Sequence, residues 1–310
     1  MEKRTSEAEE PLSPTASARL LGADDIHALA SRAGISPTKK LGQNFMTDPQ
    51  TIERIVRLAG IGPEDQVVEV GPGLGSLTLG LLKAGARVTA IEIDPKLAAL
   101  LPQTVERFQP QNAAKLRVVL SDALRIERPG QLTGIDATKP FALVSNLPYN
   151  VATPILLTLL ERFETLAHCL VLVQNEVADR LTASPGSKIY GVPSAKLAWF
   201  GAARKAGRIA RSVFWPVPNV DSSLVAFDRD PHPQWAKSLA SPLTPELRTQ
   251  TFRLIDEAFA QRRKTLRAAL KRTANAEQIQ QAGIDPALRG ERLTVGDYAR
   301  LASVLLNARE

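Results

Sequence analysis

The sequence predicts an α/β fold with a mostly parallel sheet, followed by a small C-terminal helical domain. Between about residues 50 and 174, short apolar runs alternate with helical patterns, as crossover units of a parallel sheet do. Beyond residue 245 the apolar residues recur only at helical spacing. These two observations place a sheet first and a helical bundle after it.

Each predicted element follows from a local pattern. In "TIERIVRLAG", Ile52, Ile55 and Val56 form a helical stripe that ends at Gly60. Strands are predicted at residues 66–71, 87–94, 116–122, 141–146, 169–174 and 223–227. Helices are predicted at residues 51–60, 76–85, 95–108, 153–163, 246–272 and 295–308. Between the last two strands, the glycines and prolines of residues 185–222 indicate a loop.

We divide the chain into three predicted parts. Residues 1–25 are acidic and contain serine and proline, so we expect a disordered tail. Residues 26–230 form the domain with the sheet, and residues 240–310 form the helical domain. The segment "DPHPQWAKSLASPLTP" is the expected linker between them.

Composition excludes several classes of protein. No apolar stretch approaches the length of a membrane span, and the N-terminus lacks the apolar region of a secretory signal. One cysteine and three scattered histidines predict neither a disulfide nor a zinc site, so we expect no metal and a cytoplasmic location. A net charge of +7 over 310 residues suggests a polyanionic partner.

A glycine-rich turn follows the strand predicted at residues 66–71. Its spacing, G-x-G-x-G, differs from the dinucleotide pattern G-x-G-x-x-G. Glu69 precedes it, and a carboxylate is unfavourable beside pyrophosphate but acceptable beside a ligand with amino and sulfonium groups. We predict that four residues of this turn contact such a cofactor: Glu69, Gly71, Gly73 and Gly75.

Acidic residues stand at the ends of the next two predicted strands. Glu92 is placed to accept hydrogen bonds from ribose hydroxyls, whereas Asp94 precedes Pro95 and is expected to cap a helix. Asp122 is placed to meet the exocyclic amine of an adenine ring. The carboxyl ends of parallel strands meet at one edge of the sheet, so these residues together predict a site for S-adenosylmethionine.

The strand 141–146 ends in "NLPY", which is unusual for a buried strand. The Asn146 side-chain oxygen and the Leu147 carbonyl could accept the two N–H bonds of an adenine N6 amine and favour its attack on a methyl donor. Pro148 restricts Leu147 to an extended conformation and lacks a competing N–H group. Tyr149 could stack on the flipped base. The residues alone predict adenine-N6 methylation.

These motifs resemble the ribosomal small-subunit RNA adenine dimethyltransferases (the KsgA/RsmA family) from about Lys39 to Leu305. "KKLGQNFMTD", "NLPY", "FWPVPNVDSSLV" and "GIDPALRGERLTVGDY" match family motifs in order. The resemblance implies that Phe214 holds the target adenine opposite Tyr149. It also implies a set of contacts with S-adenosylmethionine from Asn44, the Met46 backbone, Gly71, Glu92, Asp122 and Asn146. Asn175 departs from the family, which often has lysine there, and this predicts a weakened RNA or structural contact.

Two basic clusters are predicted to bind RNA phosphates. Arg263, Arg267 and Lys271 would share one face of the helix predicted at 246–272. The clusters comprise Arg204, Lys205, Arg208 and Arg211, and Arg262, Arg263, Lys264, Arg267 and Lys271.

By resemblance, we expect a monomeric enzyme that dimethylates N6 of two adjacent adenines in the 3′-terminal hairpin of 16S rRNA, within an assembling ribosomal subunit. Two alternatives stay open. One is an erythromycin-resistance-type 23S rRNA adenine-N6 methyltransferase, against which the C-terminal match argues. The other is an assembly factor whose catalysis is secondary.

Overall fold

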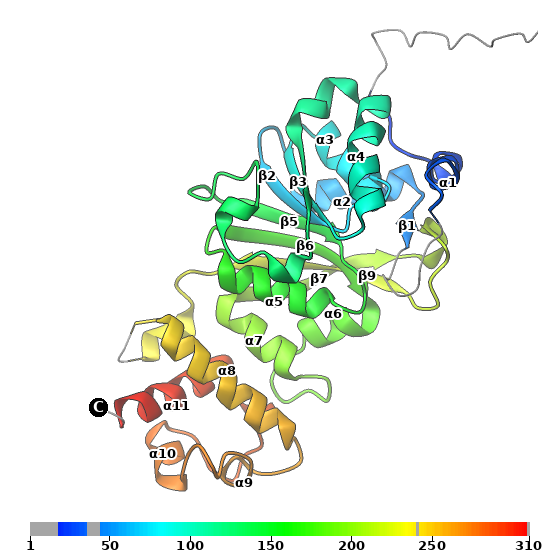
Figure 1. Ribbon diagram of the computed structural model, residues 1–310. Coiled ribbons are helices and arrows are strands. Elements are labelled where there is room, and N and C mark those ends of the chain that lie inside the picture. The colour runs from blue at the N-terminus through cyan, green and yellow to red at the C-terminus, as the bar shows by residue number, and fades with distance from the viewer. Residues whose placement is uncertain (1–17, 36–43, 240–241, 309–310) are drawn as a thin grey trace, which may run out of the picture.

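A twisted seven-stranded sheet forms the centre of the molecule (Figure 1). The computed structural model describes residues 18–35, 44–239 and 242–308. The strands of this sheet, in the order β4-β3-β2-β5-β6-β9-β7, are β4 (Leu116–Leu120), β3 (Arg87–Glu92), β2 (Gln66–Val70), β5 (Phe141–Asn146), β6 (Leu166–Gln174), β9 (Ser222–Arg229) and β7 (Gly201–Ile209). The first five are parallel neighbours, and β9 pairs antiparallel with both β6 and β7. The predicted α/β class is confirmed.

Helices cover both faces of this sheet and continue beyond it. They are α1 (Ala23–Arg32), α2 (Pro49–Ala59), α3 (Ser76–Lys83), α4 (Pro95–Phe108), α5 (Ala152–Arg162), α6 (Asn175–Leu181), α7 (Val192–Phe200), α8 (Pro245–Ala260), α9 (Leu266–Ala269), α10 (Ala276–Gln281) and α11 (Val295–Asn307). One apolar core lies between the sheet and α1 to α4. The other lies under α5 and α7 and continues into α8 to α11, so the two predicted domains share a core.

The sequence sets the start and end of several helices through capping. Asp48 and Asp94 accept hydrogen bonds from backbone N–H groups in the first turns of α2 and α4, and a proline follows each of them. Proline at the first helical position removes no useful hydrogen bond, because that N–H has no partner within the helix. Helix α2 ends at Gly60, whose φ of 65° is the left-handed conformation that glycine adopts readily.

The segment predicted to be a loop, residues 185–222, contains regular elements that the pattern analysis missed. Helix α7 and strand β7 both lie within it. Strand β7 forms an edge of the sheet and carries exposed Arg204, Lys205 and Arg208. An edge strand tolerates charged side chains because it has only one hydrogen-bonded neighbour and one largely solvated side. The alternation of apolar residues by which a strand is predicted is therefore missing from β7.

The predicted tail of residues 1–25 is too long. Leu20 and Leu21 are buried in the core beneath α1, and α1 begins at Ala23. Residues 20–25 therefore belong to the folded domain, because Leu20 and Leu21 are buried in its core and α1 has already begun. Residues 1–17 lie outside the described residues.

The predicted helix 246–272 is interrupted. Helix α8 ends at Ala260, a turn follows, and α9 spans only Leu266–Ala269. The N–H groups of Leu266 and Arg267 donate to the carbonyls of Leu288 and Pro286, so a tertiary strand-like contact replaces helical bonds at this point. Arg263, Arg267 and Lys271 consequently do not share the face of one continuous helix, and this prediction was wrong.

We predict that Gly80→Ala in α3 destabilises the protein. In an open helix, alanine would be favoured over glycine by about 1 kcal/mol. Here an added Cβ would lie 2.4 Å from Cγ2 of Ile52 on α2, which requires the two helices to separate. We expect a net loss of about 1–3 kcal/mol in the free energy of unfolding, measured by urea denaturation.

The matched control is Gly130→Ala, because an added Cβ there has no neighbour within 4 Å. Its free energy of unfolding should change by less than about 0.5 kcal/mol. A stabilised Gly80→Ala variant would contradict the close contact between α2 and α3.

Candidate functional site

A pocket opens where β2 and β5 separate at their carboxyl ends. The chain leaves β2 toward β3 and β4 on one side and later returns to β5 on the other, and ligands bind at such a switch point. The backbone pairing between the two strands ends at the pair Val68 and Leu143. Beyond it, the Ser145 hydroxyl accepts from the Val70 N–H and donates to the Val70 carbonyl. The pocket has a volume of about 880 Å³, including the open space at its mouth.

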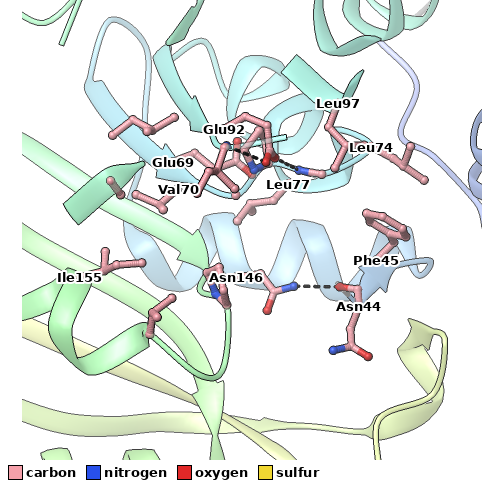
Figure 2. Close-up of a pocket in the computed structure, with 18 of the residues that line it drawn as sticks. Asn44, Phe45, Glu69, Val70, Leu74, Leu77, Glu92, Leu97, Asn146 and Ile155 are labelled. Atoms are coloured by element: carbon pink, nitrogen blue, oxygen red, sulfur yellow. Dashed lines mark hydrogen bonds between the residues drawn. The ribbon is translucent and has the colours of Figure 1, made fainter. Parts of the chain in front are cut away.

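Most of the residues predicted for catalysis and cofactor binding line this pocket (Figure 2). They are Asn44, Met46, Glu69, Gly71, Gly73, Glu92, Asp122, Asn146 and Pro148. Of the other predicted residues, Gly75, Leu147, Tyr149 and Phe214 are not part of the lining.

The glycine turn forms one wall. Gly71 and Gly73 have φ values of 69° and 59°, and the Gly71 N–H donates to the Ile91 carbonyl. An added Cβ at Gly73 would lie 2.9 Å from the Phe45 ring, so glycine is required for the approach of that ring. Gly75 instead allows the turn to pack closely against α4, because an added Cβ would lie 2.8 Å from the Leu101 side chain.

Glu92 ends β3 as an almost completely buried carboxylate. It accepts hydrogen bonds from the N–H groups of Ile93 at 2.8 Å, Asp94 at 2.9 Å and Gly73 at 3.4 Å. Burial raises the pKa of its carboxyl group, and these N–H groups oppose the increase. The predicted cap is confirmed, since the Asp94 side chain accepts from the Lys96 N–H at the start of α4.

Glu69 is the second buried carboxyl group, with an exposed fraction of 2%. The Thr78 hydroxyl donates to it at 2.6 Å. Burial raises the pKa of Glu69 to about 8, and the nearby Glu92 contributes to this increase. The inner wall of the pocket thus has two acidic groups that a cationic ligand would stabilise in their charged form.

Asp122 follows β4 on the far side of Glu92. Its side chain accepts from the Leu124 N–H at 2.9 Å, which holds the carboxylate at the pocket. Ile93 lines the same pocket and is 54% exposed, although it is apolar. Sequence reasoning missed Ile93; the signal was an isoleucine placed between two polar strand-end residues in "AIEID".

The Asn146 side chain has a defined orientation. Its Nδ2 donates to the Asn44 carbonyl at 3.1 Å (Figure 2). An amide has one donating and one accepting end, so this bond identifies Oδ1 as the atom left to accept from another group. Pro148 lies next to the glycine turn, with its ring 3.6 Å from the position of a Cβ on Gly71.

The segment before α2 is joined to the pocket through Met46. The Ser76 hydroxyl at the start of α3 donates to the Met46 carbonyl at 2.6 Å. Strand β1 (Phe45–Met46) pairs with β8 (Phe214–Trp215), with Met46 opposite Phe214. Sequence reasoning missed Ser76. The first part of the quoted motif, residues 39–43, lies outside the described residues.

Neither Phe214 nor Tyr149, the two rings predicted to hold the target adenine, is part of the pocket lining. Phe214 is 2% exposed and packs in the core beneath α1 to α4. Tyr149 is half-buried, and its hydroxyl lies 2.7 Å from that of Ser222. Leu147 is buried, and its N–H donates to the Leu172 carbonyl. The stacking role of Phe214 stays a prediction.

The predicted RNA-binding residues divide into two groups. Three have acidic partners, since Lys205 pairs with Asp179, Arg211 with Asp221 and Arg262 with Glu291. The second group has exposed side chains, as Lys205 and Arg211 also have, and comprises Arg204, Arg208, Arg263, Lys264, Arg267 and Lys271.

Two features are absent from residues 18–35, 44–239 and 242–308, the part of the chain that the structure describes. Over these ranges, the structure contains no group of three or more His, Cys, Asp or Glu side chains that could hold a metal ion. None of the helices in the same ranges has the length and apolar character needed to cross a membrane.

Comparisons with known proteins identify the family of this chain. Residues 36–306 match the family described as "Ribosomal RNA adenine dimethylase". The ribosomal RNA small subunit methyltransferase A of Bifidobacterium longum (strain NCC 2705) is 57% identical over 293 residues, which are 94% of this chain and 95% of that protein. The protein of the same name from Thermobifida fusca (strain YX) is 53% identical over 295 residues, 94% of this chain and 98% of its own.

Two solved structures are also similar. The crystal structure of the 23S rRNA methyltransferase ErmE has a TM-score of 0.59 and 26% identity, covering 84% of this chain and 99% of its own. A dimethyladenosine transferase from Plasmodium falciparum has a TM-score of 0.63 and 22% identity, covering 83% and 95%, and shows the shared fold. From its match over residues 36–306 and its close relatives, the chain belongs to the ribosomal RNA adenine dimethylase family.

Proposed function

We propose that this enzyme transfers methyl groups from S-adenosylmethionine to N6 of two adjacent adenines in the 3′-terminal hairpin of 16S rRNA. The observation that carries the proposal is the orientation of Asn146, whose Oδ1 is the accepting atom beside a pocket with buried acids. The choice of small-subunit RNA rests on relatives with 52–57% identity that are named small subunit methyltransferases.

The pocket residues fit S-adenosylmethionine. Two buried carboxyl groups beside the glycine turn would oppose a polyphosphate but attract a ligand with positive charge. Glu92 would hold the ribose hydroxyls, and Asp122, beside the exposed Ile93, would hold the adenine. When bound, the cofactor supplies a methyl group on a sulfonium, which is a strong electrophile.

The residues after β5 would then prepare the target amine. Asn146 Oδ1 and the Leu147 carbonyl would accept the two N6 hydrogens and favour the positive charge that develops on the nitrogen. The methylated amine is acidic and can lose its proton to water, so no strong base is required. Tyr149 would provide a stacking surface for the flipped base, worth about 1–3 kcal/mol.

The exposed basic residues would hold the RNA backbone. Arg204 and Arg208 on β7, and Arg263, Lys264, Arg267 and Lys271 around α9, have exposed side chains. Lys205, Arg211 and Arg262 would contribute less to RNA binding, because each is paired with an acidic residue. We also propose that the partner is an assembling small subunit in the cytoplasm and that the enzyme acts as a monomer without a metal.

A methyltransferase for 23S rRNA is the second candidate, because ErmE shares the fold. Its 26% identity is well below the 57% of the Bifidobacterium longum protein, and this difference favours the small subunit. A role in subunit assembly is compatible with either activity and is separated from catalysis by the first experiment below.

For Asn146→Ala we expect a loss of methylation of at least about 100-fold, because the transition state loses an accepting oxygen. Undermethylated small subunits and labelled cofactor are incubated with the enzyme, and mass spectrometry maps the modified nucleotides. Subunit binding should persist, measured by cosedimentation. Asn150→Ala is the control, since Asn150 is exposed in the same loop.

If the wild-type enzyme methylates nucleotides other than these two adenines, the proposed substrate is contradicted. Full activity of Asn146→Ala would contradict the proposed role of its oxygen.

Glu92→Ala should weaken the binding of S-adenosylmethionine by roughly 1–3 kcal/mol, because the ribose hydroxyls lose a charged acceptor. Isothermal titration calorimetry measures the dissociation constant. Glu106→Gln on the exposed side of α4 is the control and should bind as the wild type does. Unchanged binding in Glu92→Ala would refute the assignment of the ribose site.

Glu69→Gln should make folding less sensitive to pH. Because burial raises the Glu69 pKa from 4.5 to about 8, the folded state binds more protons across this range, and its stability falls as pH rises. The variant should therefore gain stability over the wild type, from about 1 kcal/mol or less at pH 5 to roughly 2–4 kcal/mol at pH 8.

Urea denaturation at pH 5, 6.5 and 8 measures this difference, with Glu106→Gln as the control for an exposed glutamate. A constant difference between Glu69→Gln and the wild type at all three values would show that Glu69 is not buried as a neutral acid.

A further inference from the structure

Ser222 is a buried polar residue at the carboxyl end of the parallel strands. It is the first residue of β9 and has an exposed fraction of 0%. It pairs with Gln174 of β6 on one side and with Ile209 of β7 on the other. Two neighbouring strands therefore fix its backbone.

The hydroxyl of Ser222 hydrogen-bonds that of Tyr149 at 2.7 Å. Tyr149 comes from the loop after β5, whereas Ser222 belongs to β9, and β6 lies between these two strands. The bond thus bridges the end of β6. It attaches the mobile end of a long side chain to a rigid element of the sheet.

Serine is an unusual choice for this position. Buried strand positions favour β-branched and aromatic residues, and a buried hydroxyl is costly unless it has a hydrogen-bond partner. Tyr149 is the partner that the structure provides for Ser222. The neighbouring Ser223 is equally buried, but its hydroxyl donates to Asn175 Oδ1 at 2.8 Å on α6.

A stacking surface is effective only when the ring plane is held in place. When a tyrosine in a loop loses the hydrogen bond of its hydroxyl group, its side chain regains rotamer freedom. The adenine stacked on its ring then loses alignment with the methyl donor. We propose that Ser222 is a positioning residue that holds the Tyr149 ring for stacking on the target adenine. This inference rests on the proposed function.

The experiment compares single-turnover methylation of small subunits by the wild type, Ser222→Ala, Tyr149→Phe and the double variant. Each single variant should lower the methylation rate about five- to tenfold, as the loss of one buried hydrogen bond does. KM for the subunit and the dissociation constant of S-adenosylmethionine should change less than twofold. The double variant should be no slower than the slower single variant, since both remove the same bond.

Ser223→Ala is the matched control, because Ser223 is the next residue of β9 and is equally buried, but its hydroxyl has its partner on α6. Its methylation rate should stay within twofold of the wild type, and melting temperatures verify that all variants fold. Should Ser222→Ala fail to fold, Tyr149→Phe tests the same bond without altering β9. A Ser222→Ala or Tyr149→Phe rate within twofold of the wild type, or losses that multiply in the double variant, would overturn the proposal.

The ring of Tyr149 also provides a readout independent of activity. The chain contains three tyrosines, and Tyr190 and Tyr298 are buried elsewhere. With ¹³C-labelled tyrosine, Ser222→Ala should shift or broaden the ring signal that Tyr149→Phe removes, whereas Ser223→Ala should not. An unchanged Tyr149 ring signal in Ser222→Ala would refute the positioning role, whether or not the enzyme methylates adenine. If the wild type methylates no adenine but the signal shifts, only the proposed function is refuted.

Discussion

The Ser145 hydroxyl maintains the opening on which the site depends. Where the pairing of β2 with β5 ends, it bonds both the N–H and the carbonyl of Val70, so neither backbone group is left unsatisfied. The two strands can then separate without exposing buried polar groups. The glycine turn follows one strand, and Asn146 is the last residue of the other, so the Ser145 bonds join the two walls of the pocket.

Burial of acidic groups distinguishes this pocket from a phosphate site. Glu69 and Glu92 are both nearly inaccessible, and Thr78 and backbone N–H groups hold them in place. Removing carboxyl groups from water raises the pKa of each, and a positively charged ligand would reverse part of this change. The same interaction therefore favours the cofactor over nucleotides that carry phosphate.

The basic residues show why charge in a sequence does not translate directly into a binding surface. Asn175 stands where the family often has lysine, and a weakened contact was predicted. In the structure Lys205 reaches from β7 to Asp179 and also donates to Asn175 Oδ1, so Asn175 accepts a hydrogen bond from a lysine on another element. Lys205 is exposed like Arg204 and Arg208 on the same strand, but Asp179 partly neutralises its charge.

The sequence by itself determined the alternation of strands and helices, the glycine turn and the strand ends at Glu92, Asp122 and Asn146. These features depend on local periodicity, on glycine conformation and on the rule that parallel strands end at one edge. The tertiary structure decided which of these residues line the pocket, the enclosure of Phe214, the break between α8 and α9 and the bond from Tyr149 to Ser222. Each of these joins segments far apart in the chain, and no local pattern records a contact between such segments.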